Sequence, residues 1–158
     1  TIIGSDGKVL PAIWEGKRKG VLFDVANGFN NFAFKTAREA LLDGLKPDII
    51  SSDLTMQSMY QFPVYGLPYI ISKYLCLGMD LMEAVGACTV TPAGVLGMKG
   101  EIGTLAPGSC ADIAVFKLSE SAVKFEDSLG ETETGHSLLI PQLTIRAGKI
   151  LFRQLDFM

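Results

Sequence analysis

A carboxylate that follows an apolar run is the residue of this chain with the clearest chemical potential. Residues 48–52 have the pattern of a short buried strand, and Asp53 stands at its carboxyl end. A polar side chain at the end of a parallel strand can point into an active-site mouth, where a carboxylate can transfer a proton. Asp53 could instead cap the next turn by accepting from the amides of residues 54–56. The pattern leaves both interpretations open.

The elements around Asp53 follow the order strand, helix, strand. Residues 20–25 are apolar and branched, which predicts a buried strand, and the turn dipeptide Asn27-Gly28 follows them. Apolar residues at positions 34, 37, 41 and 45 recur at helical spacing, and Gly44 is placed to end that helix. We therefore expect residues 20–25 and 48–52 to form parallel strands, with a helix over 34–43 packed outside them.

Further helices are predicted upstream and downstream of this unit. Two of them cover residues 10–18 and 67–77. A third begins with a capping box, in which Asp80 accepts from backbone amides and Glu83 reaches back to the cap. A fourth, short helix starts at Thr91-Pro92 and ends at Gly97. After residue 100, glycine and proline punctuate short strands, and Ala147–Lys149 reads as a hairpin turn. Residues 101–116 and 138–153 are thus expected to form a separate β-layer.

Composition excludes several partners. The net charge of −3 leaves no basic stripe, so nucleic acid is not expected to bind. The longest apolar stretch, residues 67–79, contains Lys73 and is too short to span a membrane. The three cysteines are widely spaced, which favours a reducing compartment over a disulfide framework. We expect a cytoplasmic protein.

Residues 100–116 carry the most specific motif, Gly-Glu-Ile-Gly-Thr-Leu-Ala-Pro-Gly-Ser-Cys-Ala-Asp-Ile-Ala-Val-Phe. It resembles the signature by which amidohydrolase-superfamily enzymes leave their barrel and return to a small β-domain. Residues 89–97 match the helix before that signature, residues 48–53 resemble a late barrel strand, and residues 20–28 resemble an earlier one. The chain is most similar to the amidohydrolase/deacetylase branch, near the dihydroorotases.

This resemblance implies an α/β fold in two parts. A (β/α)₈ (TIM) barrel needs about 250 residues, and this chain has 158. We therefore expect residues 1–99 to be the second half of a barrel and residues 100–158 to be part of a small β-sandwich domain. The first half, with its His-x-His pair and bridging lysine, would be the missing partner. Exposed strand edges also predict a homo-oligomer.

The resemblance also assigns roles at the strand ends. Asp53 would bind a divalent metal, zinc or another, and shuttle a proton as the catalytic residue. Asn27 stands where relatives carry a metal-binding histidine, and its amide oxygen is a weaker ligand, which puts a second metal in doubt. This chain alone need not bind a metal.

Three further residues are expected to contact substrate. Thr55 replaces a histidine that relatives commonly have, and it can hydrogen-bond substrate but cannot act as a base near neutral pH. Tyr65 and Gly66 lie in a segment that lines the substrate pocket in relatives, although aromatic residues are more often simply packed. His136, the one histidine, is expected in a surface loop.

Two functions follow from these residues. The first is metal-dependent hydrolysis of an amide or ester of a small molecule, by removal of an N-acyl or acetyl group or by opening of a cyclic amide. The longer enzyme would carry this activity, and this chain alone would be incomplete and inactive. The alternative is a catalytically silent binding or assembly subunit, which Asn27 and Thr55 favour.

Overall fold

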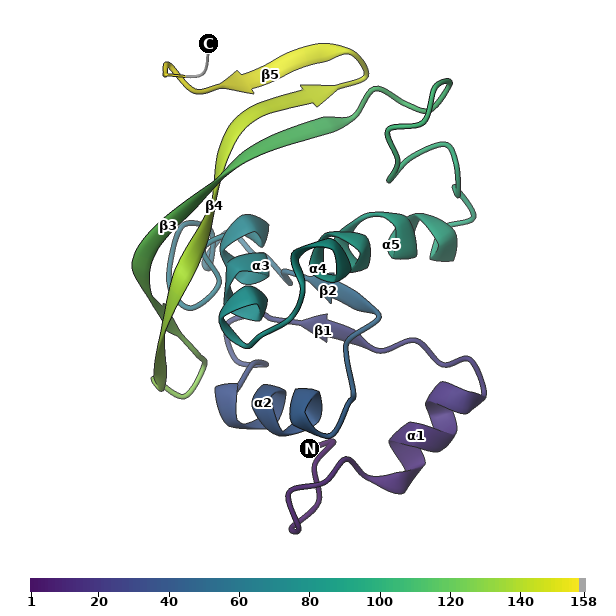
Figure 1. Cartoon of the computed structure of the whole chain (residues 1–158), viewed down its shortest axis with the longest axis vertical. Coiled ribbons are helices and arrows are strands. Elements are labelled where there is room, and N and C mark those ends of the chain that lie inside the picture. Colours follow the sequence, from purple (N-terminus) through teal and green to yellow (C-terminus); the bar gives the residue numbers. More distant parts are fainter. Residues whose placement is uncertain (157–158) are drawn as a thin grey trace.

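The computed structural model describes residues 1–156 as helices and two separate β-sheets (Figure 1). The elements in chain order are α1 (Pro11–Arg18), β1 (Asp24–Ala26), α2 (Phe34–Leu42), β2 (Ile49–Ser51), α3 (Leu67–Cys76), α4 (Leu81–Cys88), α5 (Val90–Val95), β3 (Ile113–Glu126), β4 (Thr132–Arg146) and β5 (Lys149–Arg153). Each helix within residues 1–156 is too short to span a bilayer.

The predicted parallel pair is confirmed. Strand β1 pairs with β2 in parallel, with Val25 opposite Ile50, and α2 connects the two strands. The first strand is shorter than expected, because β1 begins at Asp24. Before it, the Phe23 carbonyl still accepts from the Ile49 amide of β2 at 3.2 Å, whereas the Val21 amide donates back to Gly16 of α1 at 3.0 Å. Val21 and Leu22 are about half exposed, so this part of the apolar run is not buried as predicted.

Helix α2 is capped from a distant part of the chain. Its N-cap residue, Ala33, has no side chain that could accept a hydrogen bond, and the Phe34 amide donates instead to Asp127 Oδ2 at 2.9 Å. The other carboxylate oxygen of Asp127 accepts from the amides of Leu129 and Glu131 at 2.8 and 2.9 Å. One buried carboxylate thus holds the start of α2 and the β3–β4 turn together.

The second sheet has the antiparallel order β3-β4-β5, and β3 and β4 form a long curved ribbon (Figure 1). The separate sheet and the turn at Ala147–Gly148 are as predicted. Two details of that prediction are wrong. Residues 101–112 form turns, because their glycines and proline interrupt strand pairing, and the ribbon continues through residues 117–126 and 132–137. His136 is exposed, but it lies inside β4 and not in a loop.

A glycine explains part of the motif in residues 100–116. Gly103 has a φ of 70°, and a Cβ atom there would lie 2.7 Å from the Thr89 carbonyl oxygen. Only glycine allows this turn to contact the start of α5. At the end of the motif, Asp112 Oδ1 accepts from the Ala147 amide at 2.7 Å and so holds the β4–β5 turn.

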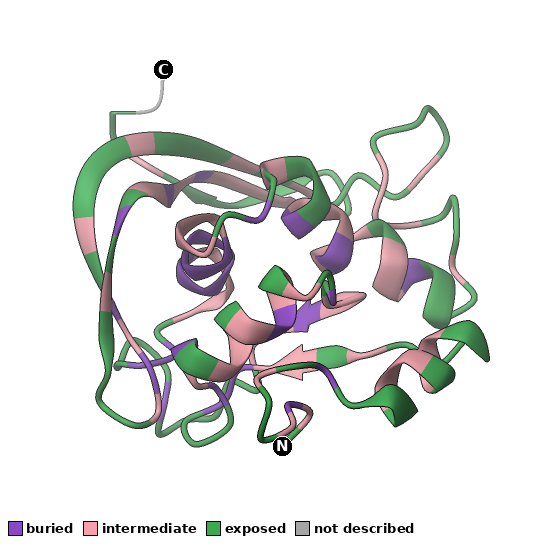
Figure 2. Ribbon diagram, turned by 60° about the horizontal axis from the view of Figure 1, so that its bottom comes forward, coloured by how far each residue is buried: buried purple, intermediate pink, exposed green. Residues whose placement is uncertain are grey.

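Helix α3 forms the centre of the core, and the concave side of the ribbon encloses it (Figure 2). Ile70, Ile71 and Tyr74 are buried together with Phe125 and Leu139 of the ribbon. Ser72 joins the two parts directly, because its hydroxyl donates to the Pro68 carbonyl and accepts from the Leu139 amide at 2.9 Å. The helix therefore has buried residues all round, as a central helix requires.

Of the capping box predicted for α4, the part played by Asp80 is confirmed and the part played by Glu83 is not. Asp80 accepts from the amides of Met82 and Glu83 at 2.8 and 3.3 Å. Glu83 does not reach back to the cap and instead pairs with Lys46. The predicted short helix before Gly97 is present as α5, and Gly97 has a φ of 71°.

We predict that Asp127→Ala destabilises the fold by about 2 to 4 kcal/mol, because it leaves three amides without their acceptor. The measurement is the free energy of unfolding in urea. Glu120→Ala, which removes an exposed carboxylate from β3, is the matched control and should change stability by less than about 0.5 kcal/mol. Equal stability of the two variants would contradict the role given to Asp127.

Candidate functional site

The carboxyl ends of β1 and β2 remain side by side after the strands end. The Asn27 amide donates to the Ser51 carbonyl at 3.2 Å, and the Gly28 amide donates to the Ser52 carbonyl at 3.1 Å. This backbone pairing brings the residues that follow both strands to one edge of the sheet. Asp53 is the first residue beyond it, as the sequence pattern predicts for a site at strand ends.

Asp53 is exposed and has a φ of 46°, in the left-handed region that few residues other than glycine adopt. Its Oδ2 accepts from Asn31 Nδ2 at 3.1 Å. The amides of residues 54–56 make no hydrogen bond to it among the described residues, and the Thr55 amide donates to Ser58 Oγ at 2.9 Å. Asp53 therefore does not cap this turn, and its carboxylate faces solvent.

Gly28 makes the position of the Asp53 carboxylate possible. A Cβ atom on Gly28 would lie 2.5 Å from Asp53 Oδ2 and 2.7 Å from Asn31 Nδ2. Gly28 also has a φ of 47°, which strains any larger residue. The dipeptide Asn27-Gly28 is thus more than a turn: its glycine gives room to the predicted catalytic carboxylate.

The side chain of Asn27 is completely buried. Its Oδ1 accepts from Lys73 Nζ at 3.4 Å. Its Nδ2 has no hydrogen-bond partner among the described residues. The oxygen that would have to bind a metal is therefore directed at an ammonium group.

Lys73 is the group that sequence reasoning missed. It is completely buried in α3, and its Nζ donates to the Pro63 carbonyl at 2.7 Å. The ammonium also lies 4.7 Å from the ring centroid of Phe32 and 5.6 Å from that of Tyr69. Burial lowers its pKa to about 8, and the negative charges of Asp127 and Glu126 partly oppose that shift.

The three residues predicted to contact substrate lie on the segment after β2, and Thr55 is apart from the other two. Thr55 is exposed, and its hydroxyl is 3.2 Å from Ser58 Oγ. Tyr65 and Gly66 line a cavity of about 400 Å³ between this segment and the ribbon. Tyr65 is 45% exposed there, with its ring centroid 5.8 Å from that of Phe62.

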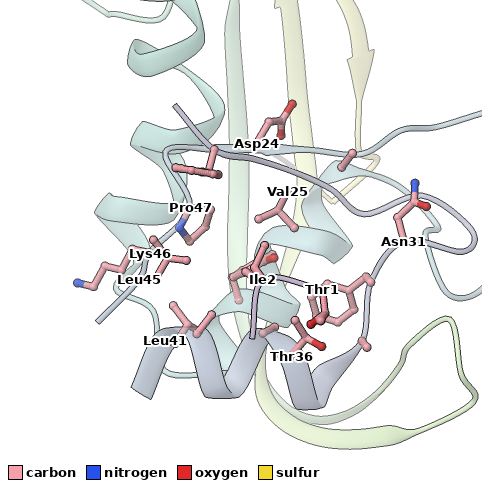
Figure 3. Close-up of a pocket in the computed structure, with 17 residues that line it drawn as sticks. Thr1, Ile2, Asp24, Val25, Asn31, Thr36, Leu41, Leu45, Lys46 and Pro47 are labelled. Atoms are coloured by element: carbon pink, nitrogen blue, oxygen red, sulfur yellow. The ribbon is translucent and has the colours of Figure 1, made fainter. Parts of the chain in front are cut away.

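A second cavity, of about 490 Å³, lies between β1 and α2. Figure 3 shows Val25, Thr36 and Leu41 around it, with Thr1 and Ile2 from the start of the chain. Asp53 lines neither of the two cavities. The cavities are lined mainly by apolar atoms, and they do not place another acid or base beside Asp53.

Of the two predicted metal ligands, Asp53 fits the role and Asn27 does not. The Asp53 carboxylate is exposed and is the type of oxygen donor that divalent cations take. Asn27 directs its oxygen at Lys73. In residues 1–156, histidine, cysteine, aspartate and glutamate form no group of three that could hold a metal. A metal bound at Asp53 would need its other ligands from elsewhere.

Of two contacts at this edge, the one made by Lys73 had a weak signal in the sequence and the one made by Asn31 had none. Lys73 stands alone as a charge in the apolar run 67–79, and a lone charge there needs a buried partner. Asn31 gave no signal, because its contact with Asp53 depends on the path of the turn after Gly28.

Comparison with known proteins confirms the resemblance read from the sequence. The amidohydrolase family model matches residues 25–151. A deacetylase of Enterococcus faecalis is 32% identical over 143 residues, and the match covers 90% of this chain and 38% of that protein. A deacetylase of Agrobacterium fabrum is 35% identical over 127 residues, or 80% of this chain and 31% of that protein. The chain thus spans about a third of the length of these relatives.

Solved structures give the same relationship. A crystal structure of an adenine deaminase matches with a TM-score of 0.91 and 30% identity, over 97% of this chain and 41% of that one. A dihydroorotase structure matches with a TM-score of 0.79 and 29% identity, over 90% of this chain and 37% of that one. The arrangement of helices and strands in this chain therefore occurs inside larger enzymes.

We predict that the buried charge of Lys73 makes stability depend on pH. Its pKa is about 8 in the folded chain and 10.5 ordinarily, so between these values the unfolded chain binds the additional proton. Stability should therefore rise with pH across that window. Cys88, whose pKa burial raises to about 11, acts in the opposite direction above pH 9.

Comparison with Lys73→Met isolates the lysine, because both proteins keep Cys88 and the tyrosines. Between pH 8 and pH 10 the wild type should gain about 2 kcal/mol relative to the variant, measured by urea unfolding. Parallel stability curves for the two proteins would show that Lys73 does not titrate in this range.

Proposed function

Because this chain belongs to the amidohydrolase family, we propose that it is part of a metal-dependent hydrolase that cleaves an amide or ester bond of a small molecule. The observation that carries the proposal is Asp53, an exposed carboxylate beyond the carboxyl end of β2, with Gly28 leaving room for it. The deacetylases among the relatives favour an N-acyl or acetyl group as the substrate. The dihydroorotase neighbour favours a cyclic amide as the second candidate.

The proposed fold of the complete protein is a (β/α)₈ barrel with a small β-domain. The parallel unit β1-α2-β2 supports the barrel, since strand, helix and parallel strand are its repeating unit. The sheet β3-β4-β5 would belong to the β-domain. The half-exposed Val21 and Leu22 would then be covered by further barrel strands or by a second copy of the chain.

In this proposal Asp53 has two tasks. Its carboxylate would hold a divalent metal, which, when bound, polarises the scissile carbonyl and makes water a nucleophile at neutral pH. Asp53 would also accept a proton from the attacking water and deliver it to the leaving group. The Asn31 amide, 3.1 Å from Oδ2, keeps the carboxylate oriented for both.

Residues 60–66 would form one wall of the substrate site. Tyr65 and Gly66 lie on the cavity of about 400 Å³, where aromatic faces could pack against an acyl group. Thr55 would donate or accept a hydrogen bond at the exposed side of the same segment. Such a wall supplies shape, and the chemistry stays with Asp53.

We predict that Asp53→Asn lowers kcat by at least 10² to 10⁴, roughly the contribution of general acid–base catalysis. The fold should remain intact, because the side chain is exposed. The assay uses the complete natural protein that contains this chain, with N-acetylated amino acids, dihydroorotate and adenine as substrates. Asp24→Asn, which neutralises an exposed carboxylate at the amino end of β1, is the matched control and should keep near-full turnover.

Retention of near-full turnover by Asp53→Asn would exclude the catalytic assignment. A complete protein that binds these compounds and hydrolyses none of them would favour the alternative, a silent binding subunit. The directed contact between Asn27 and Lys73 is the observation that supports this alternative, because it removes one ligand from the site.

A further inference from the structure

Lys73 determines which way the Asn27 amide points. An ammonium group has three donors and no acceptor, so it can only face the oxygen of an amide. The 3.4 Å contact therefore places Oδ1 on the side of α3 and leaves Nδ2 directed elsewhere. The Pro63 carbonyl, at 2.7 Å from Nζ, keeps the ammonium in place. Asn27 cannot reverse its amide without facing two donor groups toward each other.

The Asn27 Nδ2 group lacks an acceptor in a place where polar groups almost always have one. The side chain is completely buried, and Nδ2 is its atom without a partner among the described residues. Leaving such a donor unsatisfied is costly, because it has given up its hydrogen bond to water and gained none in return. Asn27 directly precedes Gly28, which contacts Asp53. An unmet donor one residue before the glycine that adjoins the predicted catalytic carboxylate points to a ligand oxygen.

We propose that Lys73 and Asn27 form a fixed hydrogen-bond donor for an oxygen atom of the substrate, a carbonyl or carboxylate oxygen, and that Asn27 does not bind a metal. This inference rests on the proposed function. Lys73 is a positioning residue, since it acts through the amide of Asn27. The adjoining turn, residues 29–31, must shift to admit the oxygen. These residues are exposed, and the side chain of Asn31 donates a hydrogen bond to Asp53.

Charge supports the same assignment. The ammonium of Lys73 stands in contact with the only oxygen that the Asn27 side chain could offer to a cation. A metal at that oxygen would lie close to a buried positive charge, and like charges repel strongly where water is excluded. A substrate oxygen that carries partial negative charge is instead attracted to the Nδ2 donor of the same amide.

Two substitutions of Asn27 separate a donor from a metal ligand. Asn27→Asp keeps an oxygen toward Lys73 and removes the N–H donor, whereas Asn27→Ala removes both. A metal ligand would respond in opposite directions, because aspartate binds zinc better than an amide does and alanine does not bind it. A donor would respond in the same direction, because neither variant can donate.

The experiment measures zinc per chain by mass spectrometry and kcat and KM in the complete protein, with the melting temperature of each variant. We expect both variants to keep the zinc content of the wild type and to lose at least tenfold in kcat/KM. Gln57→Glu and Gln57→Ala make the same changes at an exposed side-chain amide that the proposed site does not use and should leave both quantities unchanged. Lys73→Met should also lower kcat/KM at constant zinc content.

Zinc content that rises in Asn27→Asp and falls in Asn27→Ala would overturn the proposal and make Asn27 a ligand. Lower melting temperatures with unchanged kinetics would overturn it too, because the donor would then meet only an internal water. If the wild type hydrolyses no substrate, the proposed function fails, and the zinc contents still decide whether Asn27 is a ligand. Should Asn27→Asp fail to fold, Asn27→Ala and Lys73→Met carry the test.

Discussion

The desolvated ammonium of Lys73 is the constraint on which much of this structure depends. A buried charge is costly unless its surroundings supply oxygens and aromatic faces, and here the Pro63 carbonyl, Asn27 and the ring of Phe32 supply them. Each of these groups comes from a different segment of the chain. Satisfying one lysine therefore fixes the loop after β2, the end of β1 and the segment that leads into α2 relative to α3.

Asp127 provides the corresponding negative charge from the β3–β4 turn. Its carboxylate is buried, caps α2 and closes the β3–β4 turn, and its charge favours the protonated form of Lys73. The hydrophobic core follows the same connection, because Phe125 and Leu139 pack in one cluster with Tyr69 and Ile70 of α3. The division of the chain near residue 99 stays a prediction, and the core passes across it.

The edge where β1 and β2 end combines two kinds of site. Asp53 is exposed and charged, with room created by Gly28. Asn27, one residue before Gly28, is buried and directed by a cation. In the proposed enzyme, Asp53 after β2 would bind the metal and transfer the proton. Asn27 after β1 would donate a hydrogen bond to a substrate oxygen.

The sequence by itself determined the local elements and the family. Helical spacing, the short apolar runs and the glycines at 44 and 97 were enough to place α2, β2 and the end of α5, because these signals act between near neighbours. The motif in residues 100–116 identified the family, since it combines turns that need glycine with a fixed spacing. The position of Asp53 at a strand end was also readable, because strand polarity alone sets it.

Only the tertiary structure decided what lies beside those residues. The cap of α2 by Asp127 spans 93 residues, and the contact of Lys73 with Asn27 spans 46, so no local pattern could reveal either. The extent of the β3–β4 ribbon also depended on pairing between the two arms of the hairpin, from Glu126 opposite Thr132 to Ile113 opposite Ile145, which overrode the poor strand propensity of Gly135. The metal role predicted for Asn27 was a matter of residue type, whereas the direction of its amide is a matter of which group the fold places against it.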